Sequence, residues 1–565
     1  MPFRIVVIGA NAAGAKAASS AKRSNPETKV TLVDRSSTIA FSACGIPYYV
    51  SDTIAALKEL VNTPDGVVRD TSFFQSVKGV EAVTGAEAIG IDRVAKKVSL
   101  FDRTGARPFT LAYDRLILAT GSISDSASLS SMGCPNILAV KTIEDAVAIK
   151  DKAVPGKAAC IVGGGLAGLE IAEALHLKGM RVTLLEKHDH LLFGVLDRDM
   201  AQLLEKYLEG MGIKVLTSCR VAGFDGTTRV EKAMTNLGEV PADLVVLAPG
   251  VVPNITLAEE AGLKIGETGA IAVNEHMQTS DPHIFACGDC TEATHLVTGR
   301  KVYIPRGSTA NKQARIAGIN AAGGTAVFPG IVGTTIIRVF DFNAGKTGLS
   351  VAEAGAHGLK VETVVVPGHD RAHFFPGASP IILKMVAERE TGRILGLQAV
   401  GCGALDKRID AAAVAITFAA TAHQLAQMDF AYAPPFAPAM DSLIVAADIL
   451  NNKMAGHARG IPPETVRKKL AIGETFTLLD VRSPAEQLEG VIGGSIMLSL
   501  ATLRDSVDRL PKGEEIVVIC RSGLRAYEAQ RILTAAGFAD VSFMEGGLMA
   551  WPYTLDQHPS TSSAI

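Results

Sequence analysis

The sequence lacks a dominant charge sign and a long apolar run, and each absence excludes a class of protein. The 565 residues carry 55 Lys and Arg against 58 Asp and Glu, a net charge of −3, which predicts no nucleic-acid partner. No uninterrupted apolar run reaches the roughly 20 residues that a membrane helix needs. The N-terminus enters an apolar stretch at Ile5, so we expect no signal peptide, no membrane association and a cytoplasmic protein.

The sequence also lacks a cysteine framework. Because the cytoplasm disfavours structural disulfides, we expect reactive thiols among its scattered cysteines instead. One close pair, Cys287 and Cys290, has the spacing of a redox dithiol or of half a zinc site. No second pair and no spaced histidines complete a metal site, so we expect no metal. The eight cysteines are at positions 44, 134, 160, 219, 287, 290, 402 and 520.

Residues 41–49 contain Cys44, the thiol around which we expect the chemistry to be organised. Gly45 permits a tight turn and Pro47 suits the first turn of a helix, so Cys44 is expected at the positive end of a helix. Such a position stabilises a thiolate. The alternative is a buried structural cysteine, and the nucleotide-binding patterns on both sides favour the redox role.

Residues 4–34 predict the order strand, glycine turn, helix, strand. The turn lets backbone N–H groups approach a pyrophosphate at the helix N-terminus, and Asp34 with its neighbour Arg35 is placed to bind a ribose. Asn11 replaces the second glycine of the usual pattern. The prediction of a dinucleotide site therefore rests on the strand before the turn and on the acid after the second strand. The expected contacts of this turn are Gly9, Asn11, Ala13 and Gly14.

Residues 157–186 repeat this unit with the full pattern, Gly163, Gly165 and Gly168. Glu186 ends the second strand and would repel a 2′-phosphate, which favours NADH over NADPH, although Lys187 beside it weakens the preference. Two nucleotide sites need two dinucleotides, and the simplest pair is FAD with NAD(P)H.

Three further buried strands are expected to end at binding residues. The first is followed by Thr120 and Gly121, the second by Gly250, and the third by Gly288 and Asp289. A carboxylate at the last position is expected to hold a ribityl hydroxyl of a flavin.

These segments, in this order, resemble the pyridine nucleotide-disulfide oxidoreductases. The single cysteine before Gly-Ile-Pro-Tyr-Tyr resembles the branch of coenzyme A-disulfide reductases, NADH oxidases and persulfide reductases. The resemblance implies that Cys44 faces the flavin and cycles through a mixed disulfide, persulfide or sulfenate. It also implies FAD contacts from Ser42, Thr120, Gly121 and Asp289.

The chain departs from the coenzyme A-disulfide reductases at the residues expected to bind their substrate. Ala43 stands where they have Asn, Ala40 where they have Ser, and Met440 where they have Lys. Each lost charge-assisted contact removes about 1.5–3 kcal/mol, which weakens the binding of coenzyme A as a ligand or substrate. Arg23 is the remaining candidate phosphate partner, with exposed surface as the alternative.

Residues 326–450 predict four strands and a helix over 410–422. The resemblance implies that this segment is a dimerisation domain of a homodimer and that Tyr432 enters the flavin site of the other subunit. Without the resemblance, Tyr432 would be a half-buried loop aromatic.

The C-terminal residues resemble a single-domain rhodanese. Cys520 ends a predicted strand and is followed by Arg521, Ser522, Gly523 and Arg525 before a helix. Backbone N–H groups and two cations there would lower the pKa of the thiol and hold a transferred sulfur as a persulfide. We expect Ser522 and Gly523 to contact the sulfur substrate.

The predicted fold class is α/β, with two Rossmann-like domains, an α+β dimerisation domain and a rhodanese-like α/β domain. The expected boundaries are 1–150 with 255–325 for FAD, 151–254 for NAD(P)H, 326–450 for dimerisation, 451–466 for a linker and 467–557 for the rhodanese-like domain. The predicted function is FAD-dependent NAD(P)H reduction of persulfides, polysulfides or low-molecular-weight disulfides through Cys44, with sulfane sulfur carried on Cys520. An NADH oxidase and a low-turnover sensor are the alternatives.

Overall fold

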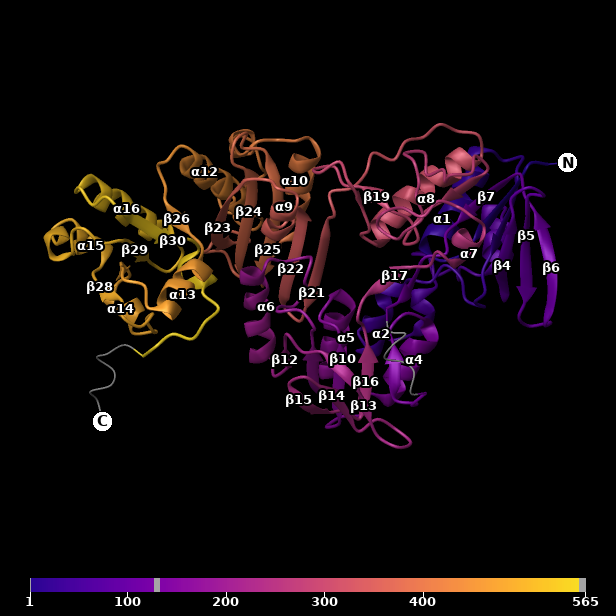
Figure 1. Ribbon diagram of the computed structural model, residues 1–565, viewed down its shortest axis with the longest axis horizontal. Helices are drawn as coiled ribbons and strands as arrows, with labels where there is room; N and C mark the ends of the chain where they lie inside the picture. The colour runs from indigo at the N-terminus through magenta and orange to yellow at the C-terminus, as the bar shows by residue number, and fades with distance from the viewer. Residues whose placement is uncertain (1, 126–132, 558–565) are drawn as a thin grey trace. The chain divides into compact units, whose positions relative to one another are not determined.

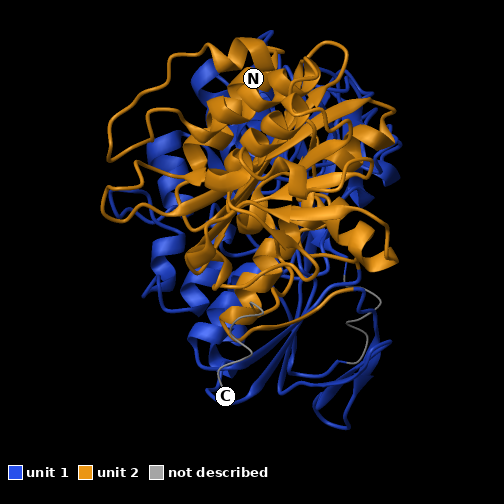
Figure 2. Ribbon diagram, turned by 90° about the vertical axis from the view of Figure 1, so that its left-hand side faces the viewer, with its two compact units in different colours: residues 1–187, 218–331 blue, residues 188–217, 332–565 orange. Residues whose placement is uncertain are grey.

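The computed structural model describes residues 2–125 and 133–557. It forms two compact units (Figure 2), Met1–Lys187 with Ser218–Ile331, and His188–Thr217 with Val332–Ile565.

The first unit contains a parallel sheet with α1 (Ala12–Ser24) and α8 (Gly307–Ala321) packed together beside it. Apart from the edge strand over residues 81–83, its strands are apolar and largely buried, as strands covered on both faces must be. Ile8 pairs with Val33 and with Leu118, so the chain leaves three neighbouring strands at one edge, where Gly9, Asp34 and Ala119 follow. In sheet order the strands are β18 (Ile284–Ala286), β7 (Arg115–Leu118), β1 (Arg4–Ile8), β2 (Lys29–Val33) and β3 (Glu81–Val83).

A second parallel arrangement in this unit repeats the first. Val162 pairs with Leu185 and with Leu247, and α5 (Leu166–Leu177) follows the turn. β9 also pairs with β16, so residues 137–139, which we predicted in the FAD domain, belong to the second sheet. The strands are β11 (Arg181–Leu185), β10 (Ala158–Val162), β16 (Leu244–Leu247) and β9 (Ile137–Ala139), and α4 (Ile143–Lys152) follows β9.

Smaller elements complete the first unit (Figure 1). An antiparallel sheet contains β4 (Ala86–Asp92), β5 (Lys97–Asp102) and β6 (Arg107–Ala112), and another contains β13 (Val221–Asp225), β14 (Lys232–Thr235) and β15 (Gly238–Pro241). β8 (Ser122–Ser124) pairs with β17 (Val251–Pro253), and β19 (Ala293–Thr294) with β20 (Lys301–Val302). The short helices are α2 (Ile46–Val50), α3 (Thr71–Phe73) and α7 (Thr256–Glu260).

An antiparallel sheet forms the centre of the second unit. The predicted helix over 410–422 is wrong at its end, because Ala419 takes a left-handed φ of 55° and Thr421 caps a new helix. In sheet order the strands are β21 (Thr335–Val339), β22 (Phe342–Gly348), β25 (Ile394–Gly401), β24 (Pro380–Glu388) and β23 (Val361–His369). Its helices are α6 (Arg198–Gly210), α9 (Val351–Ala356), α10 (Asp406–Thr417), α11 (Ala422–Ala426) and α12 (Ser442–Met454).

A parallel sheet near the C-terminus belongs to the same unit. Its order is β26 (Gly460–Ile461), β30 (Val541–Met544), β29 (Ile516–Ile519), β27 (Thr477–Asp480) and β28 (Ile496–Met497). Gly460 pairs with Phe543, so the predicted linker over 451–466 is wrong in its second half, which contributes an edge strand. The helices are α13 (Pro463–Ile472), α14 (Pro484–Gln487), α15 (Leu500–Leu503) and α16 (Leu524–Ala535).

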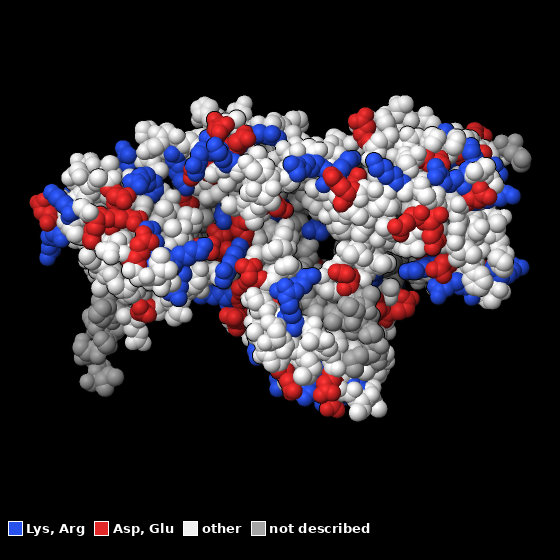
Figure 3. All heavy atoms as spheres, in the orientation of Figure 1, with Lys and Arg blue, Asp and Glu red and all other residues white. Residues whose placement is uncertain are grey.

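Two surface properties bear on the choice of partners. Within residues 2–125 and 133–557, no helix is long and apolar enough to cross a bilayer. On the face drawn in Figure 3, basic and acidic side chains are interspersed.

Candidate functional site

The first glycine turn is closed by contacts that only glycine allows. Gly9 has a φ of 97°, and a Cβ there would collide with the carbonyl oxygen of Ala119. A Cβ on Gly14 would collide with the carbonyl oxygen of Gly9, so the start of α1 packs directly on the end of β1. Asn11 precedes α1 without capping it, and its buried Oδ1 has no hydrogen-bond partner among the described residues. Ala13 is half-buried beside it.

The second turn has the same construction and an open approach. Cβ atoms on Gly163 and Gly168 would collide with the carbonyl oxygens of Ala248 and Gly163, whereas a Cβ on Gly165 would meet no described atom within 4 Å. That space is what a pyrophosphate needs at the N-terminus of α5. Gly121 and Gly250 follow the ends of β7 and β16 and have φ of 71° and 115°. A Cβ on either glycine would also meet no described atom within 4 Å.

The two predicted ribose acids occupy equivalent positions. Asp34 Oδ2 accepts a hydrogen bond from Ala10 N at 2.6 Å, and Glu186 Oε2 accepts one from Gly164 N at 2.7 Å. Each carboxylate therefore lies beside its glycine turn at the end of the second strand. The neighbouring Arg35 pairs with Glu87 at 3.7 Å, with an exposed side chain.

Asp289 lies where β18 ends, held close to α1. Gly288 has a φ of 82°, and a Cβ there would lie 2.7 Å from the Cβ of Ala13. Burial raises the pKa of Asp289, while Lys141 and a 3.5 Å hydrogen bond from Ser122 oppose that rise. Lys141 also donates to Ser122 Oγ at 3.0 Å, so this lysine, which the sequence patterns missed, joins the group.

Two more residues without a sequence motif, Tyr303 and Arg306, interact electrostatically with Asp289. Tyr303 Oη and Arg306 Nε are buried and have no hydrogen-bond partner within the part of the chain that the structure describes. Burial, and then the Asp289 charge, raise the pKa of Tyr303; burial lowers the pKa of Arg306, against the opposing effect of Asp289. Unpaired buried donors around a carboxylate fit a polar ligand such as a flavin dinucleotide.

Cys44 lies in the 3₁₀ turn η1 (Ala43–Gly45), directly before α2. Its side chain is exposed and unpaired by any disulfide, which agrees with a reactive thiol. Nevertheless, desolvation by the surrounding protein and the charges of Glu170 and Asp289 raise its pKa, and Arg306 opposes them. The predicted position of Cys44 at a helix start is confirmed, but burial is the largest effect on its pKa and raises it.

The segment after Cys44 is tied to the second nucleotide fold. α2 packs against α4 and α5. The Lys150 ammonium lies 3.9 Å from the Tyr49 ring centroid, and Asp52 pairs with Lys150 at 2.7 Å. On α5, burial and Glu173 raise the pKa of Glu170 to about 7, so a carboxyl that titrates near neutrality influences the thiol.

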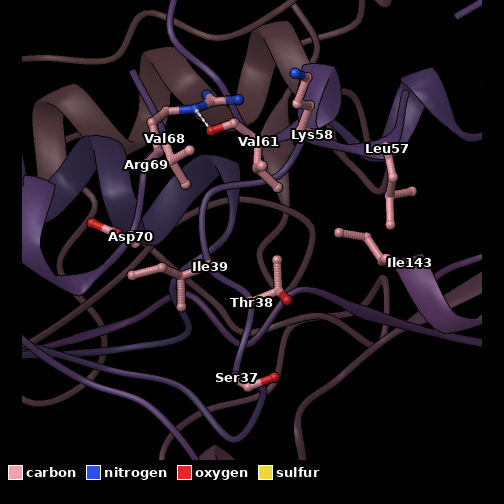
Figure 4. A pocket seen from close by; sticks show the side chains of 10 residues that line it. All are labelled: Ser37, Thr38, Ile39, Leu57, Lys58, Val61, Val68, Arg69, Asp70 and Ile143. Carbon is pink, nitrogen blue, oxygen red and sulfur yellow. Dashed lines mark hydrogen bonds between the residues drawn. The ribbon is translucent and has the colours of Figure 1, made fainter. Parts of the chain in front are cut away.

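A pocket of about 380 Å³ adjoins the loop before Cys44 (Figure 4). Arg69 donates to the carbonyl oxygen of Val61 at 3.1 Å and to Ser42 Oγ at 3.3 Å, which links the pocket wall to the predicted FAD contact Ser42. The pocket is lined by Ser37, Thr38, Ile39, Leu57, Lys58, Val61, Val68, Arg69, Asp70 and Ile143.

The other candidate residues of this unit, Arg23, Cys287, Cys290 and Thr120, take part in hydrogen bonds within the protein. Arg23 is exposed in the last turn of α1 and donates to Ser20 Oγ at 3.3 Å. Cys287 and Cys290 are fully buried, and Cys290 Sγ donates to the carbonyl oxygen of Cys287 at 3.4 Å. Thr120 Oγ1 donates to the carbonyl oxygen of Asn254 at 2.7 Å. No cluster of three or more metal-ligating side chains occurs among the described residues.

Tyr432 in the second unit is 54% exposed, near Phe436, which is 70% exposed. Ala372 N donates to the carbonyl oxygen of Pro434 at 3.1 Å, which joins this loop to the one containing Phe374, itself 69% exposed. The role of Tyr432 in the flavin site of another subunit stays a prediction, and its ring is exposed in this chain.

Cys520 ends β29 in a tight loop before α16. The thiol is fully buried, and Gly523 N donates to its Sγ at 3.0 Å. Gly523 adopts a φ of 97° at the start of α16, a conformation that favours glycine. Ser522 in this loop is half-buried.

The two predicted cations of this loop are both engaged with carboxylates. Arg525 makes hydrogen bonds of 2.7 and 2.6 Å to Glu486, and Arg521 lies exposed, 3.7 Å from Glu489. The predicted backbone N–H contact to the sulfur is present at Gly523, while both cations of the loop are paired with carboxylates.

Three successive segments of the chain match known protein families. A pyridine nucleotide-disulphide oxidoreductase family matches residues 3–314, its dimerisation domain matches 334–444, and a rhodanese-like domain matches 462–553. The chain is 37% identical over 448 residues to the NAD(P)H sulfur oxidoreductase (CoA-dependent) of Pyrococcus abyssi, covering 79% of this chain and 98% of that protein. It is 34% identical to an NADH oxidase of Methanocaldococcus jannaschii, covering 80% and 100%.

Solved structures extend the similarity over the C-terminal module. The NAD-dependent persulfide reductase from A. fulgidus is 41% identical with a TM-score of 0.92, covering 97% of this chain and 100% of that one. The reduced CoADR-RHD of Bacillus anthracis is 29% identical with a TM-score of 0.91, covering 98% of both chains. This chain therefore belongs to the pyridine nucleotide-disulphide oxidoreductase family, in a form with a dimerisation domain and a C-terminal rhodanese-like domain.

Proposed function

We propose that the enzyme uses NAD(P)H and FAD to reduce persulfides, polysulfides or low-molecular-weight disulfides at Cys44, while Cys520 carries sulfane sulfur. The observation that carries this proposal is the position of an exposed thiol, Cys44, directly before α2, which packs against α5 at the second of the unit's two dinucleotide turns. Two relatives support the substrate class, since they are a CoA-dependent sulfur oxidoreductase and a persulfide reductase.

The proposed cofactor contacts divide between the two folds. Gly163, Gly165, Gly168, Glu186 and Gly250 would hold NAD(P)H. FAD would be held by Gly9, Asn11, Ala13, Gly14, Asp34, Arg35, Ser42, Thr120, Gly121, Gly288 and Asp289, with Lys141, Tyr303 and Arg306 added from the structure. FAD, when bound, would pass two electrons from NAD(P)H to sulfur.

The chemistry at Cys44 starts from its thiolate. The thiolate attacks one sulfur of the substrate S–S bond, and the other sulfur leaves as a thiolate with the bonding electron pair. Two electrons then cleave the new bond to Cys44 and release the second thiolate. Arg306 stabilises the Cys44 thiolate electrostatically, and Glu170 is placed to destabilise it when charged.

The rhodanese-like loop would supply or collect sulfur. The Cys520 thiolate attacks the sulfane sulfur of a persulfide, the donor thiolate leaves, and the persulfide on Cys520 is held by Gly523 N. Carrying this thiol on the same chain raises its effective concentration toward Cys44 into roughly the millimolar range.

The functional form is proposed to be a homodimer that shares the exposed surface around Tyr432, Phe436 and Phe374. Coenzyme A is proposed as a ligand because of the CoA-dependent relative, although Ala40, Ala43 and Met440 replace polar residues expected to bind it.

One experiment tests the substrate class. Anaerobic NADH consumption is compared with polysulfide, glutathione persulfide and coenzyme A disulfide as acceptors, and sulfide release is measured in parallel.

An NADH oxidase is the second candidate because of the Methanocaldococcus relative. Oxygen uptake that matches NADH consumption, without turnover of any sulfur acceptor, would establish that alternative.

A further inference from the structure

The carboxylate of Glu545 is fully buried where the rhodanese-like sheet meets the dimerisation domain. It follows β30 and is 1% exposed. It accepts a hydrogen bond from Val365 N on β23 at 3.0 Å and forms an ion pair with Lys453, in the last turn of α12. β23 is the edge strand of its sheet, so its outward backbone N–H is free for such a bond.

The ammonium of Lys453 also has two contacts besides Glu545. Its ammonium donates to the carbonyl oxygen of Thr363 at 2.6 Å and lies 3.0 Å from the Glu362 carboxylate. Burial and the Glu362 charge raise the pKa of Glu545, and Lys453 opposes both. The lysine in the last turn of α12 is therefore the charge partner of a buried carboxylate of the rhodanese-like module.

The residues after Glu545 form the rear support of the loop that contains Cys520. We call residues 545–549 the back wall and residues 520–523 the sulfur loop. Leu548 N donates to the carbonyl oxygen of Cys520 at 2.9 Å, and Met549 N donates to that of Arg521 at 3.0 Å.

The back wall has no spare room. A Cβ on Gly546 would lie 3.0 Å from Val365 Cγ1, and a Cβ on Gly547 would lie 2.5 Å from the Cys520 carbonyl oxygen. A Cβ on Gly523, whose N–H contacts the sulfur, would lie 3.3 Å from Gly546 N. Glu545 is therefore joined to the sulfur loop by two closely packed glycines and two backbone hydrogen bonds.

We propose that Lys453 and Glu545 are positioning residues for sulfur transfer at Cys520: their buried ion pair fixes the back wall against the dimerisation domain and so sets the contact between Gly523 N and Sγ. The inference rests on the proposed role of Cys520. It goes beyond that role, because it makes the carrier's rate depend on a lysine outside the rhodanese-like sheet.

The test uses the full-length, FAD-loaded protein. Glutathione persulfide is the donor and cyanide the acceptor: the Cys520 thiolate takes the sulfane sulfur, glutathione thiolate leaves, and cyanide removes the sulfur as thiocyanate, restoring the thiolate. Thiocyanate formation gives kcat and KM separately. The variants are Lys453→Met, Glu545→Gln and the double variant. Lys468→Met is the matched control, because Lys468 forms an exposed pair with Glu464 at 3.0 Å.

We expect Lys453→Met to lower kcat for thiocyanate formation about tenfold or more with KM little changed, because small displacements of a reacting group are costly. Glu545→Gln keeps an acceptor for Val365 N but breaks the same ion pair, so it should also lower kcat. The double variant should be no slower than Lys453→Met, because both substitutions remove one shared interaction. Lys468→Met should match the wild type. NADH-dependent ferricyanide reduction should be the same in all four variants.

Wild-type kcat in Lys453→Met, or a double variant whose loss of kcat is the product of the two single losses, would overturn the inference. If Lys453→Met does not fold, the comparison of Glu545→Gln with the double variant decides instead: equally reduced kcat in both supports the inference, and wild-type kcat in Glu545→Gln overturns it. Cys520→Ser is measured alongside. If it still forms thiocyanate at the wild-type rate, the proposed role of Cys520 fails, which is a different result from failure of the ion pair alone.

Discussion

Arg525 donates two hydrogen bonds, of 2.7 and 2.6 Å, to the carboxylate of Glu486. Arg525 follows directly after the loop that contains Cys520. The Arg525 hydrogen bonds lower the pKa of Glu486 from 4.5 to about 2. A carboxyl whose pKa is lower in the folded state stabilises the fold above its unfolded pKa, and this stabilisation is lost as pH falls toward the folded pKa.

Glu486→Gln should therefore lower the free energy of unfolding at pH 7 by about 1–2 kcal/mol, allowing for partial exposure of the pair. The difference from the wild type should shrink as pH falls from 4.5 toward 2. Urea unfolding at several pH values measures it, and a constant difference across that range would contradict the assignment.

The raised pKa of Cys44 predicts opposite effects for its two charged neighbours. Arg306→Met removes the opposing cation and should slow alkylation of Cys44 by iodoacetamide at pH 8 in the FAD-free protein. Glu170→Gln removes an anion and should speed it, because Glu170 has a pKa of about 7 and is charged at pH 8. Peptide mass spectrometry measures alkylation at Cys44, and we expect changes of about two- to fivefold.

At pH 6 the effect of Glu170→Gln should be smaller, since most Glu170 carboxyls are then protonated. Cys402, which is also exposed, provides the internal reference peptide. If both variants are alkylated at Cys44 at the wild-type rate, neither charge influences this thiol.

The two equivalent acids, Asp34 and Glu186, should have different functions despite their matching hydrogen bonds. Glu186→Gln should lower the ratio of kcat/KM for NADH to that for NADPH by about tenfold, because a charge that repels the 2′-phosphate is removed. Asp34→Asn should leave that ratio unchanged and weaken retention of FAD during gel filtration. A coenzyme preference that changes with Asp34 rather than Glu186 would reverse the two assignments.

The glycine turns and their acids could be predicted because their chemistry is local. Gly9 and Gly14 meet backbone atoms that a short stretch of sequence brings together, and Asp34 reaches the same turn from the next strand. The same reasoning identified Cys520 and Gly523, which are three residues apart.

The residues that the sequence patterns missed come from distant parts of the chain. Tyr303, Arg306 and Lys141 approach Asp289 from loops that carry no motif, and Glu170 acts on Cys44 from a helix that follows the second glycine turn. The edge strands β9 and β26 were also missed, because three- and two-residue strands are defined by pairing with β16 and β30 rather than by their own composition.

The central claim is that Cys44 carries the electrons from NADH to sulfur, and Cys44→Ser tests it most directly. The measurement is anaerobic, NADH-dependent sulfide release from polysulfide by the FAD-loaded variant, with thiocyanate formation at Cys520 as a check that the second thiol still works. We predict that sulfide release falls at least about a hundredfold, as expected when a nucleophile is removed, while thiocyanate formation is unchanged. Sulfide release at the wild-type rate from Cys44→Ser would contradict the claim.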